Sequence, residues 1–157
     1  MANFRWLTLL DMSSLLCIGF MAAAGLFYFG ELPPRIPTHF GPGGQPDQYG
    51  DKGIVLGLPA LALGISIVIK LIGRNPSHFN FPVKVTDENR SALIGHAQLL
   101  ISGILLSTNA LIAYLHWELL QVGLGRQEAI GTGILWLFAG FVVLFSVNSY
   151  LRMKRLG

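Results

Sequence analysis

The chain has 157 residues, of which 52% are hydrophobic and 12% charged, and its mean hydropathy is +0.57. Soluble domains carry about 25% charged residues, so this composition excludes an ordinary soluble domain and favours a chain that lies in a lipid bilayer. The formal net charge is +3, but the basic residues flank the apolar runs, where they orient membrane proteins, and this argues against nucleic-acid binding.

Four apolar runs predict an all-α integral membrane protein with one four-helix transmembrane domain over residues 1–157. The spans are expected at about 5–29, 53–73, 97–117 and 132–151, each near the ~20 residues that a spanning helix needs. The first run predicts a retained span, because no small-residue cleavage site follows a short apolar core. Small residues on the first two runs predict close helix packing, namely Gly19, Gly25, Gly57 and Gly64.

Two polar segments separate these runs. The first, residues 30–52, is interrupted by prolines and glycines throughout, which predicts a stiff, irregular polar loop. The second, residues 74–96, contains Asn75-Pro76 and Phe81-Pro82, which argue against a helix in its first half. Thr86 is placed to cap a helix that continues into the third span, with Asn89 where a capping box prefers Glu or Gln.

The distribution of basic residues predicts the orientation. Of the 11 Lys and Arg residues, Arg35, Lys52 and Arg126 fall on one side of the predicted spans, and the other eight fall on the opposite side. The positive-inside rule therefore predicts both termini and the 74–96 loop in the cytoplasm, with the proline-rich loop outside.

The loop sequences resemble the domain of unknown function 1648 family, the N-terminal domain of SdpI-type immunity and signalling membrane proteins. The likeness rests on two runs, Leu-Pro-x-x-Ile-Pro-x-His-Phe followed by Gly, Pro-Asp and Tyr-Gly, and Phe-Pro-Val-Lys-Val-Thr-x-Glu-Asn. The family pattern falls on Leu32, Pro33, Ile36, Pro37, His39, Phe40, Gly44, Pro46, Asp47, Tyr49 and Gly50, and on Pro82, Val83, Lys84, Thr86, Glu88 and Asn89. The resemblance implies a small protein of the bacterial cytoplasmic (inner) membrane, and in the SdpI-type proteins immunity to a secreted peptide toxin.

The outer loop holds the main binding candidates. His39 with Asp47 and Asp51 is open to three interpretations: a divalent-metal site, an external pH sensor, or hydrogen bonds that only shape the loop. His39 and Asp47 with His116 and Glu118 would make a four-ligand metal set, although the spacing matches no standard metal motif. Ile36, Phe40 and Tyr49 are interpreted either as apolar anchors for a partner or as a lid folded over the helix ends.

Polar groups inside the predicted spans form a second set of candidates, Asp11, His96 and Asn109. An intramembrane carboxylate normally faces inward and has a partner, and Lys70, His96 and Arg152 are the expected choices for Asp11. A structural ion pair is favoured over a proton or ion relay, because little in the other spans is expected to join Asn109. Ser107 and Thr108 are expected to hydrogen-bond between helices.

Function follows from these patterns only in outline. No nucleophile–base pair or cofactor motif is present, which favours a non-enzymatic binding, sensing or immunity-like protein that acts through its outer loop on a peptide, lipid or membrane-protein partner. The alternatives are a structural accessory subunit of a larger membrane complex, and a metal-dependent membrane enzyme or transporter. The cytoplasmic motif consists of Pro82, Lys84, Thr86, Glu88 and Asn89. The charged residues of this side are interpreted as a face for a soluble regulator or for anionic headgroups, namely Lys84, Asp87, Glu88, Arg90, Arg152, Lys154 and Arg155.

Overall fold

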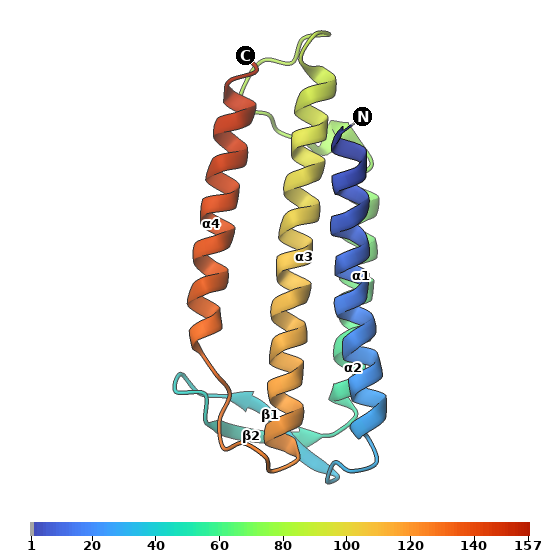
Figure 1. Ribbon diagram of the computed structural model, residues 1–157, viewed down its shortest axis with the longest axis vertical. Coiled ribbons are helices and arrows are strands. Elements are labelled where there is room, and N and C mark those ends of the chain that lie inside the picture. The colour runs from blue at the N-terminus through green and yellow to red at the C-terminus, as the bar shows by residue number, and fades with distance from the viewer. Residues whose placement is uncertain (1) are drawn as a thin grey trace.

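The computed structural model describes residues 2–157, and its fold is dominated by four long helices. They are α1 (Ala2–Tyr28), α2 (Ile54–Ile72), α3 (Arg90–Gly123) and α4 (Gly133–Lys154), with a 3-10 turn, η1 (Pro76–His78), between α2 and α3. Among the described residues these four helices are long and apolar enough to cross a membrane, which confirms that prediction. Figure 1 shows an elongated bundle with both chain ends at one end and the α1–α2 connection at the other.

The third helix is the centre of the bundle, because α1, α2 and α4 all pack against it (Figure 1). It runs directly into the third span, as predicted, but it begins at Arg90 with Asn89 as its N-cap, so the predicted start at Asp87 after a Thr86 cap was wrong. Its 34 residues give a length of about 51 Å, well beyond the ~30 Å core of a bilayer. The helix continues past the predicted span end near Trp117, and Leu119 and Leu120 in the extra turns are buried against the α1–α2 connection.

The α1–α2 connection is a β-hairpin, so the prediction of an irregular loop in an all-α fold was wrong there. Strands β1 (Arg35–Phe40) and β2 (Pro46–Asp51) pair antiparallel. The prolines are accommodated because Pro46 is the first residue of its strand and the register shifts just after Pro37. Gly44, with φ +80°, supplies the left-handed backbone that the turn between the strands requires.

The hairpin lies across the ends of α1 and α3 as a lid. Its anchor is Ile36, which is 0% exposed and packs with Leu32, Leu119 and Leu120. Gly123 lets β1 approach α3, since a Cβ there would lie 3.3 Å from Ile36. Fully burying an isoleucine stabilises a fold by about 1.5–3 kcal/mol, so this residue alone fixes the hairpin firmly to the bundle.

Close packing between helices depends on one of the four predicted glycines. A Cβ at Gly25 would lie 2.8 Å from the Val55 carbonyl oxygen, so Gly25 allows α1 to approach the backbone of α2. Gly19, Gly57 and Gly64 are exposed, and a Cβ added at any of them would meet no atom of another helix within 4 Å. The packing prediction was wrong for these three, because they lie on the outward faces of their helices.

Candidate functional site

The hairpin presents a polar face away from the helices. His39 Nδ1 and Asp47 Oδ1 lie 2.6 Å apart across the two strands, with side chains 59% and 49% exposed. Arg35 donates to the Tyr49 carbonyl oxygen at 2.8 Å, and Tyr49 is 55% exposed. The partner of His39 is therefore a carboxylate of the neighbouring strand rather than a loop carbonyl. An exposed pair of this kind contributes about 0–1 kcal/mol to stability. A ligand could therefore contact these two side chains at little cost to the fold.

Two of the three proposed apolar anchors belong to the lid. Ile36 is fully buried, and Phe40 is half-buried against the same cluster, so neither is presented to a partner as the anchor interpretation required. Tyr49 is the exposed member of the set. Of the other motif residues, Pro33 is exposed and Pro37 is buried. Gly50 lets the two strands lie close together, because a Cβ at this position would lie 2.9 Å from Thr38 Cγ2.

Two cationic side chains, Lys52 and Arg126, bind the segment that joins α1 to the hairpin. Lys52 Nζ donates to the carbonyl oxygens of Phe29 at 2.9 Å and Leu32 at 3.1 Å, both in the turn that follows the last residue of α1, Tyr28. Arg126 pairs with Glu31 at 3.2 Å and lies over the Tyr28 ring. Sequence reasoning missed Lys52, although a cation directly after a proline-rich loop is placed to reach helix carbonyls.

The four-ligand metal set is not assembled, so that hypothesis was wrong. His116 is 0% exposed in α3, and its Nε2 donates to the Val55 carbonyl oxygen at 2.8 Å. Glu118 accepts from the Gly131 backbone N–H at 2.9 Å and so holds the segment that leads into α4. Over residues 2–157, no three His, Cys, Asp or Glu side chains lie close enough together to hold a metal ion.

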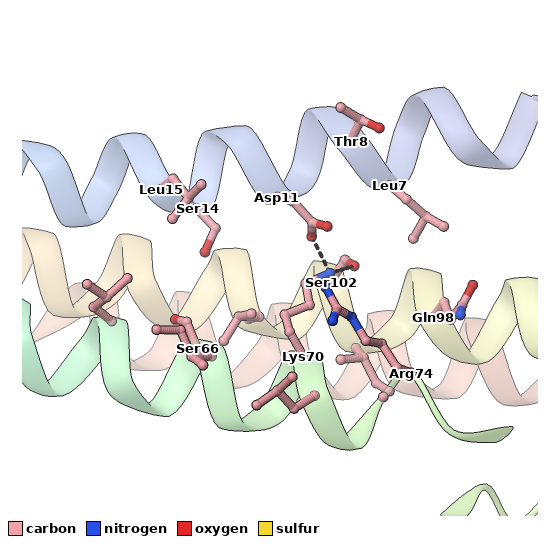
Figure 2. Close-up of a pocket in the computed structure, with 16 residues that line it drawn as sticks. Leu7, Thr8, Asp11, Ser14, Leu15, Ser66, Lys70, Arg74, Gln98 and Ser102 are labelled. Atoms are coloured by element: carbon pink, nitrogen blue, oxygen red, sulfur yellow. Dashed lines mark hydrogen bonds and ion pairs between the residues drawn. The ribbon is translucent and has the colours of Figure 1, made fainter. Parts of the chain in front are cut away.

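At the other end of the bundle, Asp11 of α1 forms an ion pair with Lys70 of α2. Lys70 Nζ also donates to Ser102 Oγ of α3 at 2.7 Å, so one ammonium group joins three helices (Figure 2). His96 and Arg152, the other expected partners of Asp11, line a different cavity of about 790 Å³ between α3 and α4. The intramembrane carboxylate is therefore paired and directed inward, as its cost in a bilayer requires.

Asn109 has partners on both neighbouring helices, contrary to the sequence expectation. Its Nδ2 donates to Ser14 Oγ at 2.6 Å and to Ser66 Oγ at 3.0 Å. Helical spacing could have revealed this. Ser14 lies three residues from Asp11, Ser66 four residues from Lys70, and Asn109 seven residues from Ser102, so each pair shares one helix face. The expected interhelical bonds of Ser107 are instead made within α3, to the carbonyls of Gly103 and Ile104.

The polar contacts along the three helices are interrupted beyond Asn109. Between Asn109 and His116 the buried side chains are apolar, namely Ile18, Met21, Ala62 and Ala113. Seven residues of helix correspond to about 10 Å, which is too far for direct proton transfer between the two polar groups. The arrangement therefore fits a structural ion pair better than a relay across the membrane.

The cytoplasmic motif joins the start of α3 to the end of the chain. The Thr86 backbone N–H donates to Asn89 Oδ1 at 2.8 Å, and the Asn89 backbone N–H donates to Thr86 Oγ1 at 3.4 Å, so these two residues close the turn that precedes α3. Asn89 Nδ2 donates to the Lys84 and Leu156 carbonyls, both at 3.0 Å. The side-chain hydrogen bond from Thr86 holds the pKa of the Glu88 carboxyl below its usual value.

Comparison with known proteins finds one similar protein and one family model that matches the hairpin region. An uncharacterized protein of Archaeoglobus fulgidus (strain ATCC 49558 / DSM 4304 / JCM 9628 / NBRC 100126 / VC-16) is 28% identical over 156 residues, which cover 89% of this chain and 84% of that protein. No solved structure matches the chain. The family model for a domain of unknown function (DUF1648) matches residues 16–63, from α1 through the hairpin into α2, and does not extend to the Phe-Pro-Val-Lys-Val-Thr run. The resemblance predicted from the outer-loop motif is thus confirmed as a match of residues 16–63 to the family model for a domain of unknown function (DUF1648).

Proposed function

We propose that this is a non-enzymatic membrane protein that binds an extended polypeptide segment of a partner along the exposed strand β2. Both termini lie in the cytoplasm and the hairpin lies outside the cytoplasmic membrane. The distribution of charge supports this orientation, because Arg35, Lys52 and Arg126 are at the hairpin end and the other eight of the 11 Lys and Arg residues are toward the opposite end.

The observation that carries the proposal is the contrast between the two strands. On β1, Ile36 and Pro37 are buried against the bundle, whereas on β2 three consecutive residues, Asp47, Gln48 and Tyr49, are exposed. Successive residues of a strand point to opposite faces, so both faces of β2 are uncovered at this point. Strand β2 is therefore a free sheet edge held on a rigid base.

A free edge offers backbone N–H and C=O groups that pair with an added strand, and side-chain pockets then give specificity. Tyr49 supplies an aromatic contact, and Arg35 with the His39–Asp47 pair supplies polar ones. Because Ile36 fixes the hairpin beforehand, little conformational entropy is lost on binding. Binding of a secreted peptide, the immunity-like role that the SdpI-type resemblance implies, is one form of this activity.

Photo-crosslinking in native membranes tests the proposal. A benzoylphenylalanine at position 48 or 49 should give a discrete polypeptide adduct, and peptide mapping should place the partner residues in one extended segment. The same probe at Trp136 on α4, which is 81% exposed, is the matched control and should not give that adduct. Absence of a polypeptide adduct at 48 and 49, or the same adduct at 136, would reject binding along β2.

The alternative, a structural accessory subunit, is favoured by one observation about α4. This helix packs against α3, while its large side chains Trp136, Leu137 and Leu144 are 70% exposed or more. A larger assembly would cover this face in a stoichiometric complex. Extraction in a gentle detergent followed by size-exclusion chromatography separates the two functions. An accessory subunit that contacts its partners through α4 should elute with them in a fixed ratio, even when a bulky group at position 48 blocks strand β2.

A further inference from the structure

A cleft at the end of the bundle opposite the hairpin has the features of a ligand site. It lies between α1, α2 and α3 and has a volume of about 590 Å³. Figure 2 shows polar side chains from all three helices directed into it, including Asp11, Lys70, Arg74, Gln98 and Ser102. This cleft is outside the hairpin and its proposed binding edge, and it involves none of the residues used there.

The polar end of the cleft carries one uncompensated positive charge. Asp11 neutralises Lys70 through their ion pair, and Arg74, one helical turn beyond Lys70, has no acidic partner in the described chain. The Arg74 and Gln98 side chains make no hydrogen bond or ion pair within residues 2–157. Arg74 is exposed, and a guanidinium group binds phosphate oxygens in a two-pronged geometry, so this end of the cleft suits a singly charged anion of that kind.

The remainder of the cleft is apolar and opens on the surface that faces lipid. Leu15 of α1 and Leu63, Ile67 and Leu71 of α2 form its rim, and each of them is at least 39% exposed. A free phosphate ion would gain nothing from this lining, whereas an acyl chain would bury apolar area against it. The inner limit is the Ser14–Asn109–Ser66 cluster, where the helices close together.

We propose that this cleft binds one anionic phospholipid, with its phosphodiester at Arg74 and Gln98 and one acyl chain along Leu63 and Ile67. The charge of a phosphodiester headgroup matches the single positive charge of the cleft. Arg74 lies two residues beyond Ile72, the last residue of α2, so a bilayer that this helix spans would place it near the headgroup phosphates. A zwitterionic lipid of the same chain length carries a second positive group that would face Arg74 and Lys70.

Native mass spectrometry of the full-length protein with an equimolar mixture of phosphatidylglycerol and phosphatidylcholine of identical chains tests the assignment. One phosphatidylglycerol should bind with roughly tenfold preference, because both lipids carry the phosphodiester but only phosphatidylcholine carries a cation that Arg74 and Lys70 would repel. The variant Arg74→Gln should lose this preference. Lys154→Gln, which removes an exposed cation at the same end of the bundle but outside the cleft, should keep it within about twofold.

A second variant tests the apolar part of the site. Ile67→Trp places a large side chain at the rim without changing charge, and it should reduce phosphatidylglycerol binding while the folded protein keeps its helical circular dichroism. Inorganic phosphate up to millimolar concentration should not displace the lipid. Equal binding of the two lipids, an unchanged preference in Arg74→Gln, or displacement by phosphate alone would each overturn the proposal.

Discussion

His116 supplies to the backbone of α2 the hydrogen bond that Pro59 removes. In an α-helix the residue at position 59 would donate its N–H to the carbonyl of Val55, and proline has no N–H to donate. His116 Nε2 donates to that carbonyl at 2.8 Å from the neighbouring helix. Because a carbonyl only accepts, the neutral ring carries its proton on Nε2, and Nδ1 has no partner in the described chain.

This relationship predicts an energetic coupling between the two positions. His116→Leu should destabilise the protein by about 1–3 kcal/mol, because the Val55 carbonyl is left buried without a donor. In a Pro59→Ala background the helix supplies its own donor, so the same substitution should cost at least about 0.5 kcal/mol less. Unfolding in mixed detergent micelles measures both values. Equal costs in the two backgrounds would show that His116 acts only through packing.

Gly25 and Gly19 provide a matched pair on α1. A Cβ at Gly25 would lie 2.8 Å from the Val55 carbonyl oxygen, whereas Gly19 has no neighbour within 4 Å. Gly25→Ala should therefore cost about 1–3 kcal/mol by forcing α1 away from α2. Gly19→Ala should be neutral or stabilise the protein by up to about 1 kcal/mol, through helix propensity. Thermal unfolding of the two variants in one detergent decides, and equal effects would contradict the close approach at Gly25.

The Asp11–Lys70 ion pair should contribute modestly. The two side chains are 38% and 33% exposed, so solvent and headgroups screen the attraction, and Asp11→Asn should cost about 1 kcal/mol. Combining it with Lys70→Met should cost less than the sum of the single variants, since neither charge is then left alone. A double-variant cycle at low and high salt measures this coupling. A coupling energy of zero at both salt concentrations would show that the Asp11–Lys70 ion pair does not stabilise the protein.

The Asn109 cluster should show a graded response. Ser14→Ala and Ser66→Ala each remove one acceptor of the Asn109 amide and should cost about 0.6 kcal/mol. Asn109→Ala removes both contacts and leaves a gap among α1, α2 and α3, so it should cost more than the two serine variants together. Differential scanning fluorimetry of the three variants checks the order. A cost at Asn109 below that of either serine would contradict it.

The sequence predicts the helices well and the contacts between them less well. The spans follow from hydropathy, which records only the length of an apolar run, so the ends of α3 beyond the bilayer could not be found this way. The hairpin was missed because its prolines are usual signs of a loop, and only Ile36 packing on Leu119 and Leu120 makes the strands stable. That contact joins residues more than eighty positions apart, which no local pattern contains.

For the candidate sites too, the sequence predicts individual residues better than the contacts between them. The outer-loop motif and Asp11 were found from residue type and position, because an exposed histidine–carboxylate pattern and a charge in a span are local signals. Ser14 and Ser66 were not connected to Asn109, although their periodic spacing from Asp11 and Lys70 placed them on one face. The donor role of His116 toward Val55 could be inferred only once α2 and α3 were placed side by side.

The orientation of the hairpin is the claim on which the proposed function depends, and site-specific labelling tests it directly. Gly43 is exposed with no neighbour within 4 Å, so a cysteine there should be accepted, and Lys154 near the end of α4 offers the matched position at the other end. In a Cys17→Ser background, a membrane-impermeant maleimide should label Gly43→Cys on intact cells and label Lys154→Cys only after the cells are opened. The reverse pattern would place the hairpin in the cytoplasm and contradict binding of an external partner.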